Sequence, residues 1–130
     1  MISEIRLFLD NIKPALLLKT VDDNLKDFYI KEVDGGFIIS RNEIPQTFTA
    51  KSLGIYLGYY PRSCENFFFN KNKTILDFNG IRFNTGGFTN EAVEWCKQTY
   101  GKLMIEKYNN IKYTLEENGT VLETIEINNI

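Results

Sequence analysis

The sequence predicts an α+β fold, a single compact domain in which antiparallel β-hairpins are combined with a few helices. Three pairs of apolar, strand-like runs are each joined by a two-residue Asp-Gly or Asn-Gly turn, the strongest short-range signal of a hairpin. Strands and helices do not alternate as they do in parallel-sheet proteins. The chain of 130 residues has the length of one domain, and its 43% hydrophobic and 25% charged residues are typical of globular proteins.

The chain opens with apolar residues at helical spacing. Ser3 is a suitable N-cap and Pro14 cannot continue a helix, so we expect a short amphipathic helix over residues 3–12. The apolar run from Ala15 to Val21 then predicts a strand. The apolar positions of the expected helix are Ile2, Ile5, Phe8, Leu9 and Ile12.

The three hairpin turns are expected to resemble one another. In the favoured type I′ turn both central residues have positive φ, which Gly, Asn and Asp tolerate best. We therefore expect a left-handed backbone at both residues of every turn. The turns are Asp34-Gly35 between 28–33 and 37–40, Asn79-Gly80 between 74–78 and 81–85, and Asn118-Gly119 between 111–116 and 121–127.

Residues 47–72 predict a short helix pair at about 50–70. Gly58 suits the end of the first helix, and Pro61 suits the first turn of the second. Three consecutive phenylalanines at 67–69 span about 200° of a helix, so at least one is expected to face solvent, another part of the chain or a partner. The expected apolar faces are Leu53, Tyr56 and Leu57 in the first helix and Cys64, Phe67 and Phe68 in the second.

The clearest helix lies between the last two hairpins, at about 90–108. We expect Thr89 as its N-cap and Glu91 in its first turn, where a negative charge suits the helix dipole. Cys96 is interpreted as a small buried hydrophobe on the apolar stripe. Trp95 falls on the polar face and either tucks under a hairpin or anchors a partner. The stripe consists of Val93, Cys96, Tyr100, Leu103, Met104 and Lys107, with Gly101 as an interior flaw.

The chain contains no histidine, and this absence excludes several kinds of enzyme. Histidine is the usual general base near neutral pH and the commonest zinc ligand, so Ser-His-Asp triads, Cys-His pairs and HExxH metal sites are impossible. The two cysteines, Cys64 and Cys96, form neither a CxxC motif nor a disulfide framework. We expect no metal and no cofactor. Cys64, at a helix start beside Arg62, is the candidate nucleophile if the protein is an enzyme.

Glu4, Arg6 and Asp10 interrupt the apolar N-terminal stretch, which argues against a signal peptide. No run in the sequence approaches the roughly 20 apolar residues of a membrane span. The sequence therefore predicts a cytoplasmic protein without membrane contact. The net charge of −2 provides no overall attraction for nucleic acid.

The helix pair resembles the helix-turn-helix of DNA-binding proteins. Gly54 stands at the small-residue position of the first helix, Gly58 at the turn, and Cys64 at the buried position of the second helix. The resemblance implies a second helix in the major groove, presenting polar side chains to bases and basic ones to phosphates. The alternative is a helix pair that only builds the core. That second helix offers Arg62, Ser63, Glu65, Asn66 and Phe69.

The same stretch, from Leu57 to Phe68, also resembles an LGYPPxxVExFF segment of small uncharacterised proteins from low-GC bacteria and their phages. The chain has Tyr60 where that segment has proline and Cys64 where it has valine. The resemblance covers about a dozen residues. It implies a phage or mobile-element origin and no particular activity.

Two further patterns indicate binding. Gly86-Gly87, just before the long helix, is a weak candidate anion site because its backbone N–H groups could face an anion. An acidic patch is expected in the C-terminal hairpin, and such patches can occupy basic, nucleic-acid-binding grooves of other proteins. The patch consists of Glu116, Glu117, Glu123 and Glu126.

These observations favour a non-catalytic binding protein, a phage or mobile-element accessory that docks on a host protein, for example as an inhibitor of a bacterial defence system such as CRISPR. The alternatives are a DNA-binding regulator that uses residues 50–70, and a nucleotide-sequestering protein that combines Tyr59, Tyr60 and Arg62 with the Gly86-Gly87 turn. The expected partner-binding residues are Tyr59, Tyr60, Arg62, Phe69 and Trp95.

Overall fold

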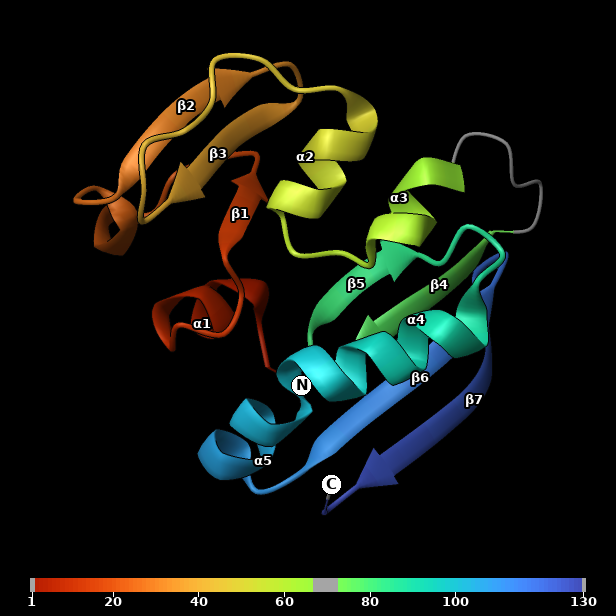
Figure 1. The fold of residues 1–130 in the computed structure, drawn as a ribbon. Helices are drawn as coiled ribbons and strands as arrows, with labels where there is room; N and C mark the ends of the chain where they lie inside the picture. Colours follow the sequence, from red (N-terminus) through yellow and green to blue (C-terminus); the bar gives the residue numbers. More distant parts are fainter. Residues whose placement is uncertain (1, 67–72, 130) are drawn as a thin grey trace.

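Two antiparallel sheets, a short N-terminal helix, a helix pair and a long helix form a single α+β domain (Figure 1). The structure, a computed structural model, describes residues 2–66 and 73–129. The predicted fold class, with its hairpins, its short helix pair and its long helix, is confirmed. Within the described residues, no helix is long and apolar enough to cross a bilayer.

The first sheet has three strands in the order β1-β3-β2. Helix α1 (Glu4–Leu9) covers one of its faces, where Phe8 packs against Leu16 and Ile39. On the other face, the Tyr56 hydroxyl contacts Ser40 Oγ at 2.9 Å. A 3₁₀ turn at Asp23–Leu25 adds Leu25 to the core between sheet and helix. The strands are β1 (Ala15–Leu18), β2 (Tyr29–Val33) and β3 (Gly36–Ser40).

Helix α1 follows the prediction at its start but ends earlier than expected. The Ser3 side chain accepts a hydrogen bond from the Arg6 N–H at 3.1 Å, which confirms Ser3 as the N-cap. The helix stops at Leu9 because Asn11 turns into the left-handed region, with φ of 64°. Leu7 then contributes to one core cluster and Phe8 to the other, so α1 lies where the two halves of the molecule meet.

The second sheet has four strands in the order β5-β4-β6-β7, with every neighbouring pair antiparallel. The strands are β4 (Thr74–Phe78), β5 (Ile81–Asn84), β6 (Ile111–Glu117) and β7 (Thr120–Ile127). A β-bulge interrupts the β6–β7 ladder, because Glu116 pairs with Val121 and Leu115 with Glu123, which leaves Leu122 as the extra residue.

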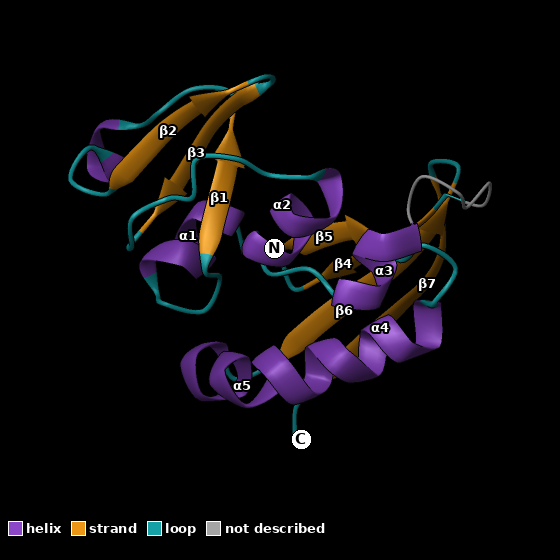
Figure 2. Cartoon of the chain, turned by 45° about the horizontal axis from the view of Figure 1, so that its top comes forward, coloured by secondary structure: helices purple, strands orange, loops and turns teal. Residues whose placement is uncertain are grey.

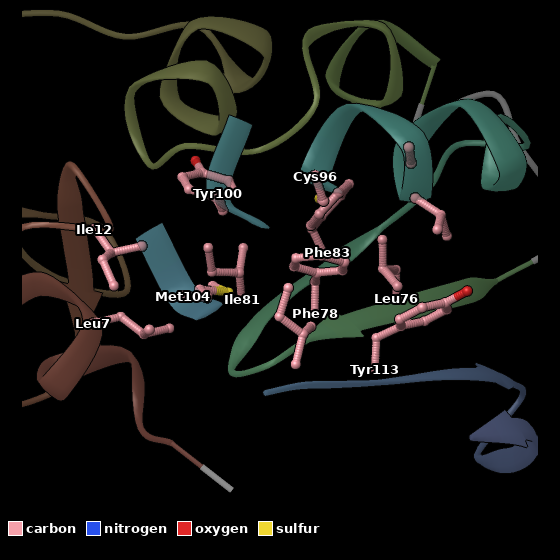
Figure 3. Close-up of a cluster of buried hydrophobic side chains, with 13 residues drawn as sticks. Leu7, Ile12, Leu76, Phe78, Ile81, Phe83, Cys96, Tyr100, Met104 and Tyr113 are labelled. Atoms are coloured by element: carbon pink, nitrogen blue, oxygen red, sulfur yellow. The ribbon is translucent and has the colours of Figure 1, made fainter. Parts of the chain in front are cut away.

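The long helix runs along one face of the four-stranded sheet (Figures 1 and 2). It consists of α4 (Thr89–Cys96), a π-helical turn at Lys97–Gly101 and α5 (Lys102–Tyr108). Its apolar side meets the sheet in the larger core cluster (Figure 3). That cluster contains Leu7, Ile12, Leu76, Phe78, Ile81, Phe83, Ala92, Val93, Cys96, Tyr100, Met104, Ile111 and Tyr113.

The π-helical turn corrects the predicted apolar stripe. A π turn holds more residues than an α turn, so the buried positions advance from Tyr100 by four residues to Met104. Leu103, predicted on the stripe, is instead 48% exposed, and Lys107 is also exposed. The predicted N-cap is wrong as well. Phe88 occupies that position, while the Thr89 hydroxyl lies 2.9 Å from the Thr85 hydroxyl.

Two of the three hairpin turns have the expected backbone. Asn79 and Gly80 have φ of 50° and 108°, and Asn118 and Gly119 have φ of 51° and 83°. In the first hairpin the prediction is wrong for Asp34, whose φ is not positive, whereas Gly35 and Gly36 have φ of 90° and 150°. The second glycine explains the difference, because it lets the left-handed conformation move one residue along the chain.

Substitutions at Met104 and Leu103 test which of these two residues the π-helical turn places in the core. Met104→Ala is expected to lower the free energy of unfolding by about 2–5 kcal/mol, because it leaves a cavity in the core. Leu103→Ala, the matched control on the adjacent residue, is expected to change it by about 0.5 kcal/mol or less. Urea unfolding measures both variants. Equal losses would contradict the observed register.

Candidate functional site

The helix pair singled out by the sequence joins the two sheets. Helix α2 (Ala50–Tyr56) begins with a capping box in which Thr49 and Ser52 exchange side-chain hydrogen bonds with each other's backbone. Helix α3 (Pro61–Asn66) packs against it closely, since a Cβ added at Gly54 would lie 2.6 Å from Cys64 Sγ. The small residue in the first helix and the buried Cys64 in the second are therefore packing positions.

The C-terminus of α2 is held by two side chains from distant parts of the chain. The Lys13 ammonium donates to the Leu57 carbonyl at 2.8 Å and to the Ala15 carbonyl at 2.8 Å. The Tyr100 hydroxyl donates to the carbonyl of Gly58, whose φ of 93° ends the helix. The last carbonyls of a helix have no partner within it, and a cation there also suits the helix dipole. We call Lys13, Leu57, Gly58 and Tyr100 the junction.

Lys13 is almost completely buried, with 1% of its surface exposed. Its Nζ lies 5.0 Å from the centre of the Tyr59 ring, and among the described residues no carboxylate forms a salt bridge with it. Burial lowers the pKa of its amine to about 8, although Glu4 opposes that shift. Sequence reasoning missed Lys13, because nothing in its neighbourhood marks a lysine before Pro14 as buried.

Next to the junction, the expected partner-binding aromatics pack mainly against the protein itself. Tyr59 stacks on Phe83 with a centroid distance of 5.2 Å, and burial raises the pKa of its hydroxyl. Tyr60 lies against Trp95 at 5.5 Å, and Trp95 meets the Tyr100 ring edge-on. Trp95 is thus partly covered by Tyr60 rather than tucked under a hairpin.

The Arg62 guanidinium group contacts both a carboxylate and an aromatic ring. Its Nη1 lies 2.9 Å from a Glu91 carboxylate oxygen, and its Cζ lies 4.4 Å from the centre of the Phe88 ring. The Tyr60 hydroxyl donates to the same carboxylate at 3.0 Å. The structure therefore brings together Tyr60, Arg62 and Trp95 around Glu91. Phe69, the fifth expected residue, lies outside the described residues, as do Phe67 and Phe68.

Two oppositely charged side chains of the helix pair form an ion pair with each other. Lys51 on α2 forms a 2.6 Å ion pair with Glu65 on α3, and this contact lowers the pKa of the Glu65 carboxyl. Together with the Arg62–Glu91 pair, it neutralises one basic side chain on each helix that could otherwise contact phosphates. This arrangement gives a DNA-binding use of the pair little physical support.

Neither cysteine thiol has the exposure or the low pKa that a reactive cysteine needs. Cys64 and Cys96 are buried, and burial raises their pKa values to about 11 and about 12. The reactive form is the thiolate, which is scarce at neutral pH for both residues. Among the described residues, no group of His, Cys, Asp and Glu side chains is arranged to hold a metal ion.

The four acidic residues of the C-terminal hairpin do not form one patch. Glu116 pairs with Arg82 on the neighbouring strand β5, which neutralises its charge. Glu123 lies opposite Leu115, and Glu126 lies opposite Lys112. Residues three apart on a strand point to opposite faces, so Glu123 and Glu126 lie on different sides of the sheet. Glu117, opposite Thr120, lies next to the turn.

Gly86-Gly87 forms the turn that leads into α4, with φ of 63° and 89°. The Gly86 N–H donates to Asn84 Oδ1 at 2.8 Å. This amide therefore stabilises the turn itself, and an anion site at these residues stays a prediction. The glycine pair is separated in sequence from Tyr59 and Arg62, but β5 brings Asn84 and Phe83 close to Tyr59.

Comparisons of the chain with protein-family models, with curated proteins and with solved structures find no match.

The buried amine makes stability depend on pH. Between pH 8 and 10.5 the unfolded chain keeps the Lys13 proton while the folded chain loses it, so a rising pH favours folding. Relative to Lys13→Met, the free energy of unfolding of the wild type is expected to rise by up to about 3 kcal/mol across this window. Urea unfolding at stepped pH measures the difference. Lys102→Met, an exposed lysine on α5, is the control, and parallel profiles of wild type and Lys13→Met would contradict the burial of the charge.

The reaction of Cys64 and Cys96 with iodoacetamide tests whether both thiols are buried. Native protein at pH 7.5 is expected to react with iodoacetamide at least about tenfold more slowly than the urea-unfolded chain, because both thiols are buried and protonated. Mass spectrometry of the labelled protein assigns the modified residue. Fast native labelling of Cys64 would restore it as a candidate nucleophile.

Proposed function

We propose that this protein is a non-catalytic binding protein, a phage or mobile-element accessory that docks on a host protein. An inhibitor of a bacterial defence system, for example an anti-CRISPR protein, fits this description. The support from the structure is that its candidate reactive and basic groups are already engaged by other groups of the chain. Cys64 is a protonated buried thiol, Lys13 satisfies carbonyls, and Arg62 is paired with Glu91.

The observation that carries the proposal is the edge strand β7. It pairs with β6 on one side, and no described strand pairs with its other side. Val121 and Leu122 on this strand are 55% and 59% exposed, and Glu123 follows directly. Exposed apolar side chains beside the Glu123 carboxylate suit a basic partner surface, such as the nucleic-acid-binding groove of another protein.

The bulge at Leu122 and the carboxylates also explain why such an edge need not cause self-association. A bulge twists a strand edge, and like charges oppose pairing with an identical strand. A partner strand or surface that carries lysine and arginine would meet no such repulsion. The edge thus favours a different, basic protein over a second copy of this chain.

The two alternatives receive less support. DNA binding through α3 would have to break the Lys51–Glu65 and Arg62–Glu91 pairs, which would offset part of the gain from phosphate contacts. Nucleotide binding on Tyr59 would have to displace Phe83 from its ring. DNA binding would thus open two ion pairs of the helix pair, and nucleotide stacking would move a side chain of β5.

The proposal is tested with the tagged full chain as bait in lysate of a bacterial host. Wild type is expected to recover one host protein in stoichiometric amount. The double variant Val121→Lys, Leu122→Lys is expected to lose it by at least about tenfold, because the added charges would face a basic partner. The control is Leu103→Lys, at a leucine on α5 that is 48% exposed, which should bind like wild type. No stoichiometric partner, or an unaffected double variant, would refute the proposal.

A mobility shift assay tests the first alternative separately. We expect no shift of duplex DNA at 150 mM salt. A shift that weakens steeply with salt and disappears in Arg62→Ala would instead establish DNA binding through the helix pair.

A further inference from the structure

A cavity of about 270 Å³ lies within the helix pair, between α2, α3 and strand β5. Figures 1 and 2 both show the two helices beside this strand. Its walls are mostly apolar and include Leu53, Leu57 and the aromatic side chains of Tyr59 and Phe83. Among the lining residues that the structure describes, none carries a charge.

One polar group in this wall lacks a partner. Ser63 is completely buried, and its hydroxyl oxygen has no hydrogen-bond partner among the described residues. Buried hydroxyl groups in proteins are nearly always hydrogen-bonded, because leaving one unpaired costs free energy. Since Ser63 lines the cavity, a bound molecule could supply the missing partner.

The frame around the cavity resists collapse. The contact between Gly54 and Cys64 fixes the approach of the two helices, and the junction fixes the end of α2 through Lys13 and Tyr100. The Tyr59 ring on its wall is fixed against Phe83. Rigid apolar cavities of 150 Å³ in other proteins bind benzene, so this larger volume suits a bicyclic ring system.

We propose that this cavity binds a small neutral bicyclic aromatic molecule with one hydrogen-bonding group, of the size and polarity of indole, whose polar atom pairs with the Ser63 hydroxyl. The lining residues that the structure describes favour a neutral ligand, because none of them carries a charge that would compensate an ionic one. The aromatic walls favour an aromatic ligand through edge-to-face and stacked contacts. This site is separate from β7 and does not depend on the docking proposal.

The test uses the full chain with two probes, indole and its isosteric hydrocarbon indene, titrated by heteronuclear NMR. Saturable shifts are expected for the backbone amides of Leu53, Ser63 and Phe83 with both probes. Indole should bind about five- to tenfold more tightly than indene, because only its N–H can pair with the Ser63 hydroxyl. Absence of saturable binding of either probe would overturn the proposal.

Two variants separate the role of Ser63 from that of the cavity. Ser63→Ala is expected to reduce indole binding to the level of indene while leaving indene binding unchanged, and to fold at least as stably as wild type, because it removes the unpaired hydroxyl. Leu53→Trp, at a half-buried position that lines the cavity, is expected to fill it and abolish binding of both probes. Its control is Ile55→Trp, an exposed position on the same helix outside the lining residues. Should Leu53→Trp fail to fold, Leu53→Phe fills the same space with a smaller side chain. An indole preference that survives Ser63→Ala, or binding that survives the filled cavity, would show that the site is wrong.

Discussion

The buried ammonium of Lys13 is the interaction on which the arrangement of this protein depends. It sits between the start of β1 and the end of α2, where it donates to the Ala15 and Leu57 carbonyls. Beside it, Tyr100 from the long helix donates to the Gly58 carbonyl. Three segments far apart in sequence are thus joined at the end of one short helix. Burying a charge without a carboxylate is costly, and it is tolerated here because the carbonyls and the helix dipole compensate part of the cost.

This junction explains why the helix pair, although ordered like a helix-turn-helix, is built as internal structure. Lys13 and Tyr100 hold the turn between its helices by hydrogen bonds to backbone carbonyls. Its charged side chains form ion pairs, Lys51 with Glu65 and Arg62 with Glu91. The same packing creates the apolar cavity that Ser63 lines. The exposed apolar side chains of Val121 and Leu122 lie instead on the far edge of the second sheet. The two proposals therefore concern separate regions with different chemistry.

Sequence patterns were most informative where the physics is local. The Asn79-Gly80 and Asn118-Gly119 turns, the Ser3 cap and the stop at Gly58 follow from backbone preferences of single residues, and the structure has them all. Patterns failed where a neighbour in sequence or space changed the local outcome. A second glycine shifted the conformation at Asp34, and a π turn moved Leu103 out of the core. Glu123 and Glu126, close in sequence, were separated because successive strand residues alternate between faces.

The sequence alone determined the fold class, the hairpins, the absence of histidine chemistry and the burial of Cys96, because these depend on composition, turn residues and apolar periodicity. Only the tertiary structure decided that Lys13 is buried, that Arg62 is paired, that Trp95 lies against Tyr60 and that Ser63 faces a cavity. Each of these outcomes depends on groups distant in sequence that meet after the sheets and helices have packed. A single sequence records which groups are present, whereas their contacts set their charge, exposure and availability for binding.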